Sequence, residues 1–190
     1  IDSKGYLNGY RIGEYPKNPP RGFIRLDNES DKDIEVAPHF KLGQFLCKQQ
    51  PDAWPKYVLV TQSNLKRLET LRDSLVKENI TDAQTFFVMS GFRTPFYNTA
   101  IGSAKLSRHM YGDAADIYID VKPRDGNMDD INGDGTVDKT DANYLYDYAA
   151  KLFARSEEVQ PGGIGSYKAN AVHGPFVHVD GRGHVARWGR

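Results

Sequence analysis

The sequence predicts a single domain of the α+β class. Three observations support this prediction: a length of 190 residues, short β-branched or aromatic runs interspersed with two amphipathic helical stretches, and no internal repeat. The expected order is strand, helix, strand, strand, inserted loop, helix, strand. A chain of this size buries roughly 68–75% of its unfolded surface, so its core needs no disulfide bonds.

Residues 1–56 predict an extended arm packed on the body of the domain, because prolines interrupt regular structure throughout this region. We expect scattered aromatic side chains to anchor the arm in preference to stacking on a ligand: Tyr6, Tyr10, Tyr15, Phe23 and Phe40. His39 has no acidic neighbour in the sequence, and we interpret it as structural.

Periodicity predicts the elements that follow the arm. A β-branched run predicts a strand over 57–61, and a helix from Ser63 carries leucines at spacings of three and four. Those leucines form one core-facing stripe: Leu65, Leu68, Leu71 and Leu75. We further expect strands over 85–92, 113–120 and 176–180, a loop or short helix at 95–98, and a helix over 141–155. The glycines at 162, 163 and 165 mark the tail of the chain.

The composition excludes several classes of protein. Lys plus Arg and Asp plus Glu both number 25, so the net charge is +0, and we expect no nucleic-acid partner. No run approaches the roughly 18 apolar residues of a membrane span, so we expect no membrane insertion. Cys47 is the single cysteine, which excludes an internal disulfide and any zinc site of paired thiolates. The chain begins at Ile1, so we expect that any export signal has been removed or was never included.

The segment "SRHMYGDAAD" combines His109 and Asp116 with a glycine between them. In a helix these two residues would lie roughly 10 Å apart, whereas a loop turning at Gly112 into a strand can bring both onto one cation. His178, on the strand "FVHVD", is the third candidate ligand. Two imidazoles and one carboxylate leave a fourth position for water, as in catalytic zinc sites. The alternative is that both histidines hydrogen-bond within a core.

The same segment matches the pattern S-x-H-x-x-G-x-A-x-D and resembles the zinc D-Ala-D-Ala carboxypeptidase and murein endopeptidase family, peptidase family M15. The blocks "VMSGFRTPFYN", "GGIGSY" and "FVHVDGRGHVARW" extend the resemblance over nearly the whole chain except 122–142. The resemblance implies a small antiparallel sheet flanked by helices, as in the hedgehog domain. It also implies that zinc is bound by His109, Asp116 and His178.

The family resemblance assigns Arg93 to steadying a substrate carboxylate or the developing oxyanion, which suits a planar guanidinium. We expect Tyr97 and Asn98 to shape the same wall of the site.

Two residues are candidates for the general base, because Pro175 stands where several family branches carry an acidic residue. We favour His173 as the base. Asp180 could serve as the base or could orient the imidazole of His178, and we favour the orienting role. We interpret His184 as a polar residue at the surface or on the substrate side.

Residues 125–141 contain six Asp and one Lys, a local charge of −5. Oxygen-bearing residues fall at positions 1, 3, 5, 7, 9 and 12 of an EF-hand-type loop, with Gly135 at position 6. The loop resembles the dockerin variant, and we expect it to bind one structural Ca²⁺ through Asp130, Asn132, Asp134, Thr136, Asp138 and Asp141. The alternative is a solvated acidic turn.

We therefore expect a single peptidase domain over 1–190, with the arm at 1–56 and an inserted calcium loop at 122–142. The expected activity is zinc-dependent hydrolysis of peptide bonds in peptidoglycan stem peptides, by a D-Ala-D-Ala carboxypeptidase or a cross-link endopeptidase. The expected location is periplasmic or extracellular, and the expected state is a monomer. The rivals are a zinc-containing binding module without activity and a lysin that cuts another bond, such as L-Ala-D-Glu.

Overall fold

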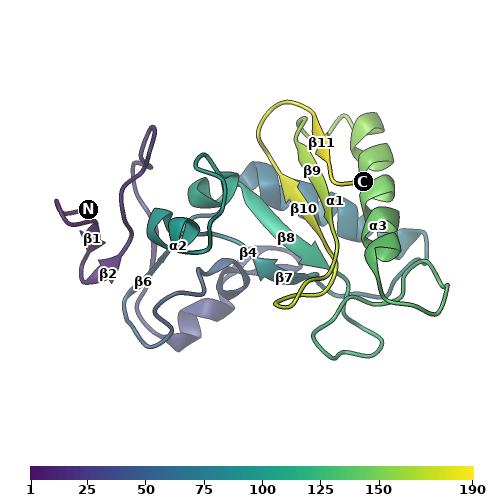
Figure 1. Ribbon diagram of the computed structural model, residues 1–190, viewed down its shortest axis with the longest axis horizontal. Coiled ribbons are helices and arrows are strands. Elements are labelled where there is room, and N and C mark those ends of the chain that lie inside the picture. Colours follow the sequence, from purple (N-terminus) through teal and green to yellow (C-terminus); the bar gives the residue numbers. More distant parts are fainter.

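The computed structural model describes residues 1–190 and has a five-stranded sheet at its centre, in the order β11-β9-β10-β8-β7 (Figure 1). All neighbouring strands pair antiparallel except β11 and β9, which are parallel. The strands are β7 (Phe87–Ser90), β8 (Ala114–Tyr118), β9 (Gly163–Tyr167), β10 (Phe176–Asp180) and β11 (Ala186–Trp188). The α+β prediction with a small antiparallel sheet is confirmed in class, with one parallel strand at the edge.

Two long helices pack against the sheet, α1 (Gln62–Lys77) against β10 and α3 (Lys139–Arg155) against β9 and β10. The leucine stripe predicted for α1 is fully or almost fully buried in the main core. Alternate residues of β10 belong to the same core, because successive side chains of a strand point to opposite faces. Val177 and Val179 therefore lie on the core side, and His178 and Asp180 on the opposite face.

The boundaries of both long helices follow from side-chain caps. Thr61 accepts the backbone N–H of Asn64 and begins α1, so the expected strand over 57–61 is cut short to β6 (Lys56–Val58). Asp138 accepts the N–H of Thr140, which begins α3 two residues before the predicted position. A short helix, α2 (Pro95–Ala100), occupies the region where we expected a loop or helix.

The strand β9 was not predicted, because its sequence "GIGSY" is rich in glycine and we interpreted the region only as a tail. In the structure β9 is a central strand, hydrogen-bonded to β10 on one side and β11 on the other. A side chain at Gly165 would overlap the indole of Trp188 on β11. The glycine therefore makes room for a neighbouring aromatic ring.

The N-terminal region contains only short elements, of which β1 and β2 lie at one end of the molecule (Figure 1). Its second half reaches the main core through Phe40, Leu42 and Phe45. Tyr10 and Phe40 are buried, and the Tyr15 hydroxyl donates to the carbonyl of Met110 at 2.8 Å, so aromatic residues do anchor the region. Its elements are β1 (Tyr6–Leu7), β2 (Tyr10–Arg11), β3 (Ile24–Leu26), β4 (Glu35–Ala37), β5 (Phe40–Lys41) and the 3-10 helices η1 (Glu29–Asp33) and η2 (Leu42–Phe45).

None of the helices has the length and apolarity needed to cross a membrane.

Candidate metal centre

The turn before β8 aims His109 at the sheet. A 3-10 helix, η3 (Arg108–Tyr111), ends at Gly112, whose φ is 66°. A Cβ at Gly112 would overlap the backbone carbonyl of Leu59, so only glycine fits this turn. The chain then enters β8, and the Nδ1 of His109 lies 2.7 Å from the carbonyl oxygen of Gly91. This contact fixes the direction of the imidazole.

The register of β8 and β10 brings the other two residues together. His178 on β10 is paired directly with Asp116 on β8, and both side chains project from the same face of the sheet. The two residues are 62 positions apart in the sequence. Their meeting therefore depends on strand pairing and on no local motif.

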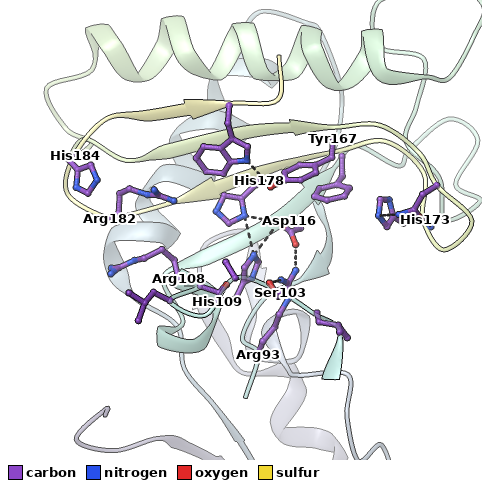
Figure 2. A pocket seen from close by; sticks show the side chains of 17 residues that line it. Arg93, Ser103, Arg108, His109, Asp116, Tyr167, His173, His178, Arg182 and His184 are labelled. Atoms are coloured by element: carbon purple, nitrogen blue, oxygen red, sulfur yellow. Dashed lines mark hydrogen bonds and ion pairs between the residues drawn. The ribbon is translucent and has the colours of Figure 1, made fainter. Parts of the chain in front are cut away.

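Three ligand atoms form a nearly equilateral triangle. The Nε2 of His109 lies 3.2 Å from the Nδ1 of His178, the same Nδ1 lies 2.8 Å from Asp116 Oδ1, and His109 Nε2 lies 3.2 Å from that oxygen (Figure 2). All three residues are buried, with exposures of 2% to 7%. We call His109, Asp116 and His178 the triad.

Hydrogen-bond partners on the far side of each ring determine the tautomers. A carbonyl oxygen can only accept, so the Nδ1 of His109 carries its proton and its Nε2 presents a lone pair to the triangle. The Nε2 of His178 lies 3.0 Å from Asp180 Oδ2, so this nitrogen carries the proton and Nδ1 presents a lone pair. Two ring lone pairs and one carboxylate oxygen thus converge, an arrangement that calls for a cation.

The protonation equilibria of His109 and Asp116 agree with this arrangement. Burial lowers the pKa of His109, which keeps its imidazole neutral. Burial alone would raise the pKa of Asp116, but His109 and His178 outweigh burial and hold it well below its usual value. Asp116 is therefore an ionised carboxylate. Burial would lower the pKa of His178, but Asp116 and Asp180 raise it above the ordinary value.

Asp180 is fully buried, and its hydrogen bonds are those of a carboxylate that orients a neighbouring imidazole. It accepts from His178 Nε2, from the backbone N–H of Gly163 at 3.0 Å and from the Nε of Arg182 at 2.8 Å. Burial would raise the pKa of Asp180, but His178 and Arg182 outweigh burial and lower it. Neither oxygen faces the triangle freely, so the geometry favours the orienting role over the role of base.

Arg93 lies beside the triad and pairs with the second oxygen of Asp116. Its Nε donates to Ser90 Oγ at 2.7 Å and its Nη1 to Ser103 Oγ at 3.3 Å. All three nitrogens of the guanidinium thus have protein partners. The structure places Arg93 primarily on the ligand carboxylate, whereas the sequence predicted a contact with substrate.

A cavity of about 820 Å³ opens over the triad. His173 and His184 line this cavity, but neither contacts the triad. Figure 2 shows His173 beyond Tyr167, on the far side of the cavity from His184. The Nδ1 of His173 lies 2.8 Å from the Gly174 carbonyl, and Asn170 Nδ2 lies 2.8 Å from its Nε2. The predicted base is therefore a wall residue whose lone pair is engaged by Asn170.

Tyr97 and Asn98 do not line the cavity, contrary to expectation. Both belong to α2, and Asn98 is buried. The side-chain Nδ2 of Asn98 donates to the carbonyl of Ala104 at 3.0 Å, and the backbone carbonyl of Asn98 accepts the N–H of Ser103. Asn98 therefore supports the cavity wall from behind, because Ser103 and Ala104 are lining residues.

Two groups of side chains have metal-ligating atoms within 4.8 Å of one another. They are the triad and a surface group of His39, Glu69 and Asp73. His39 has a structural partner that is remote in the sequence, because Glu69 of α1 lies 2.7 Å from its Nδ1. That distance and the exposure of Asp73 identify the surface group as an ion pair between α1 and the β4–β5 turn. This ion pair joins residues that are 30 positions apart in the sequence, so it forms only in the folded chain.

The acidic loop at 130–141 does not form such a cluster. Asp130 accepts the backbone N–H groups of Gly133 and Gly135 at 2.8 and 2.7 Å. Asp141 is fully buried and accepts the N–H groups of Ile131, Asn132 and Asp138. The remaining predicted ligands, Asn132, Asp134, Thr136 and Asp138, lie in the same turn. The carboxylates of Asp130 and Asp141 thus accept hydrogen bonds from the loop backbone.

Sequence reasoning missed two residues that frame the site. The indole of Trp188 lies 5.2 Å from the His178 ring, and its Nε1 donates to the Tyr167 hydroxyl at 2.8 Å. Arg182 lies over the same indole and binds Asp180. The only available signal was the position of Arg182 two residues after Asp180.

Residues 38–131, about half of the chain, match the family model described as Peptidase M15. The matched region contains Arg93, His109 and Asp116, whereas His178 lies beyond it and is joined to them by the sheet. A search of curated proteins finds no match. The match to the family model, together with the signature around His109, shows that the chain belongs to peptidase family M15 and is a peptidase.

Proposed function

We propose that this chain is a zinc-dependent metallopeptidase that hydrolyses peptide bonds in bacterial peptidoglycan. The observation that carries the proposal is the convergence of two imidazole lone pairs and one carboxylate oxygen on the floor of an open cavity. Family membership supports the peptidase class.

The donor set fits zinc better than a hard cation. Nitrogen and carboxylate ligands about 2.0–2.1 Å from a tetrahedral zinc are separated from each other by roughly 3.3 Å. The triad edges of 2.8 to 3.2 Å come close to that separation. Calcium would require six or more oxygen ligands, and two of the three donors here are nitrogens.

In this proposal His109, Asp116 and His178 hold the ion. When bound, zinc would lower the pKa of a water molecule and polarise the scissile carbonyl. Asp180 keeps the Nε2 of His178 protonated and so keeps Nδ1 as the ligand atom. Arg93 fixes Asp116 through its second oxygen, and its side chain lines the cavity.

For the general base we propose His173, which lines the cavity and whose imidazole can both accept and donate a proton. Its lone pair must first be released by Asn170. Replacing His173 by Ala is expected to lower turnover at least about 10²-fold while zinc stays bound. Steady-state kinetics with metal analysis checks this, and unchanged turnover would remove His173 from the role.

The substrate class follows from the resemblance to D-Ala-D-Ala carboxypeptidases and murein endopeptidases. We propose that the scissile bond involves a D-amino acid of a stem peptide, either terminal or in a cross-link. The enzyme would act in the periplasm or outside the cell, where peptidoglycan lies.

The decisive experiment is incubation of the zinc-loaded protein with purified peptidoglycan, followed by mass spectrometry of the released fragments. Release of peptides that depends on zinc supports the proposal, and the fragment masses identify the bond. His109→Ala and Asp116→Ala should lose both zinc and cleavage. Zinc binding without release would instead support the rival reading, a cell-wall binding module without turnover, which the absence of an acid at Pro175 motivates.

We also propose that the loop at 130–141 binds one structural Ca²⁺, and the register of its oxygen-bearing residues is the only support. Isothermal titration with Ca²⁺ tests it, with Asp134→Asn as the variant and Asp147→Asn on α3 as the control. Absence of binding at millimolar Ca²⁺ would leave the loop as a turn closed by its own hydrogen bonds.

A further inference from the structure

One wall of the cavity is cationic. Arg93, Arg108 and Arg182 line the cavity, whereas Asp116 is its only lining carboxylate. Arg93 pairs with that carboxylate, so the charges of Arg108 and Arg182 meet no opposite charge on the cavity surface. Figure 2 shows Arg108 and Arg182 on one side of the triad, with His184 near them and His173 on the opposite side.

Each of these two guanidiniums is held from behind by a buried carboxylate. Arg108 donates from Nε and Nη2 to Asp113, and Arg182 donates from Nε and Nη2 to Asp180. Asp113 is 3% exposed, and the hydroxyl of Thr61 at 2.8 Å fixes its other oxygen. The guanidiniums are therefore ordered before any ligand arrives, which reduces the entropy lost on binding.

The outer edge of both groups is free. The Nη1 of Arg108 and the Nη1 of Arg182 donate no hydrogen bond within the protein, and neither is a buried unpartnered atom. The side chains are 38% and 25% exposed. Arg93 differs, because all its nitrogens have partners and its side chain is only 13% exposed.

Asp113 connects the two arginines, because it binds Arg108 with its side chain and the residue before Arg182 with its backbone. The backbone N–H of Gly181, next to Arg182, donates to the carbonyl of Asp113 at 3.0 Å, and the side chain of Asp113 holds Arg108. The indole of Trp188 lies 5.1 Å from the Arg182 guanidinium and supports it from another side. Two fixed guanidiniums with free N–H groups thus share one end of the cavity.

We propose that Arg108 and Arg182 form a carboxylate subsite that binds a free carboxylate of the peptide substrate. A guanidinium binds a carboxylate more strongly and with better geometry than any neutral group. The inference deepens the proposed function and rests on it, since it selects anionic peptides among the possible substrates. The carboxylate is either the C-terminus of the D-amino acid or an acidic side chain of the stem peptide.

The test measures binding apart from cleavage. Protein freed of metal by a chelator is titrated, by NMR or calorimetry, with an N-acetylated tripeptide ending in D-Ala-D-Ala, with its C-terminal amide, and with an amidated peptide carrying D-glutamate. The metal is removed because a bound metal ion would itself bind a carboxylate and hide the contribution of the two arginines. We expect at least one carboxylate-bearing peptide to bind about 10-fold or more tightly than the uncharged amide, and the preferred peptide identifies the source of the carboxylate.

Arg108→Gln and Arg182→Gln should each reduce this preference to about threefold or less, whereas Arg155→Gln, on the exposed end of α3, should retain it. Zinc content of Arg108→Gln should equal that of the wild type, which separates substrate binding from damage to the triad. Equal preference in the wild type and both variants, or no preference in the wild type, would overturn the subsite. Zinc-loaded wild type that prefers carboxylates but cleaves no peptide would instead refute the proposed function.

Discussion

Asp180 owes its chemistry to three hydrogen-bond donors, two of them two residues away in the sequence and the third on the neighbouring strand β9. The peptide N–H of Gly163, the imidazole of His178 and the guanidinium of Arg182 all donate to its two oxygens. The sequence left two roles open for Asp180, because alternation along β10 shows only that it shares a face with His178. Packing favours the orienting role, since both oxygens already accept hydrogen bonds.

Asp180→Asn is expected to weaken zinc binding about 10- to 100-fold, because a neutral amide orients the imidazole of His178 less firmly. Competition with a chromophoric chelator measures the affinity. Asp147→Asn is the control, because Asp147 pairs with Arg190 on the surface of α3. Equal affinity of Asp180→Asn and wild type would contradict the orienting role.

The same carboxylate makes stability depend on pH. The pKa of Asp180 is lower in the folded chain than the ordinary value of 3.8, so its stabilising contribution is present above about pH 4 and is lost as the pH falls. The metal-free wild type should therefore lose more unfolding free energy between about pH 5 and pH 2 than Asp180→Asn does. Urea unfolding across this range measures the difference, and parallel curves would contradict it.

At the scale of elements, the turn from η3 into β8 is the feature that the sequence predicted best. The glycine between His109 and Asp116 indicated a turn, and the structure gives Gly112 a positive φ and no space for a side chain. Strand β9 was the opposite case. Its glycines argued against a strand by propensity, but they fit the side chains of Asp180 and Trp188, which only the assembled sheet brings near.

Gly112→Ala is expected to destabilise the protein by clearly more than Gly102→Ala. Both glycines have a φ of 66°, so both variants pay the same cost of roughly 1–2 kcal/mol for a left-handed alanine. A Cβ at position 102 meets nothing within 4 Å, whereas one at position 112 overlaps Leu59. Denaturant unfolding measures the unfolding free energy of both variants. Equal losses of that free energy would show that the overlap with Leu59 does not destabilise Gly112→Ala.

At the scale of the whole molecule, metal binding joins parts of the chain that are far apart. The triad links η3, β8 and β10, and β10 lies next to both long helices. An ion that binds only the folded triad must therefore stabilise the entire domain.

Zinc at about 100 times its dissociation constant should raise the unfolding free energy of the wild type by about 2.7 kcal/mol. His109→Ala should lose this gain, because one of the three ligand atoms is removed. Thermal unfolding with and without zinc measures it. His39→Ala, in the surface ion pair, serves as the control and should keep the full gain.

The sequence by itself determined the α+β class, the two long helices, the turn at Gly112 and the residue types that could hold a metal. These features follow from spacing along the chain, which governs local structure directly. Tertiary structure alone decided that His178 faces Asp116 and that both oxygens of Asp180 accept hydrogen bonds within the protein. It also decided that His173 lies in the cavity wall and that Arg108 and Arg182 share one end of the cavity. The physical reason is that strand register and packing are set by the burial of the whole sheet, so side chains 62 positions apart meet only once that sheet has formed.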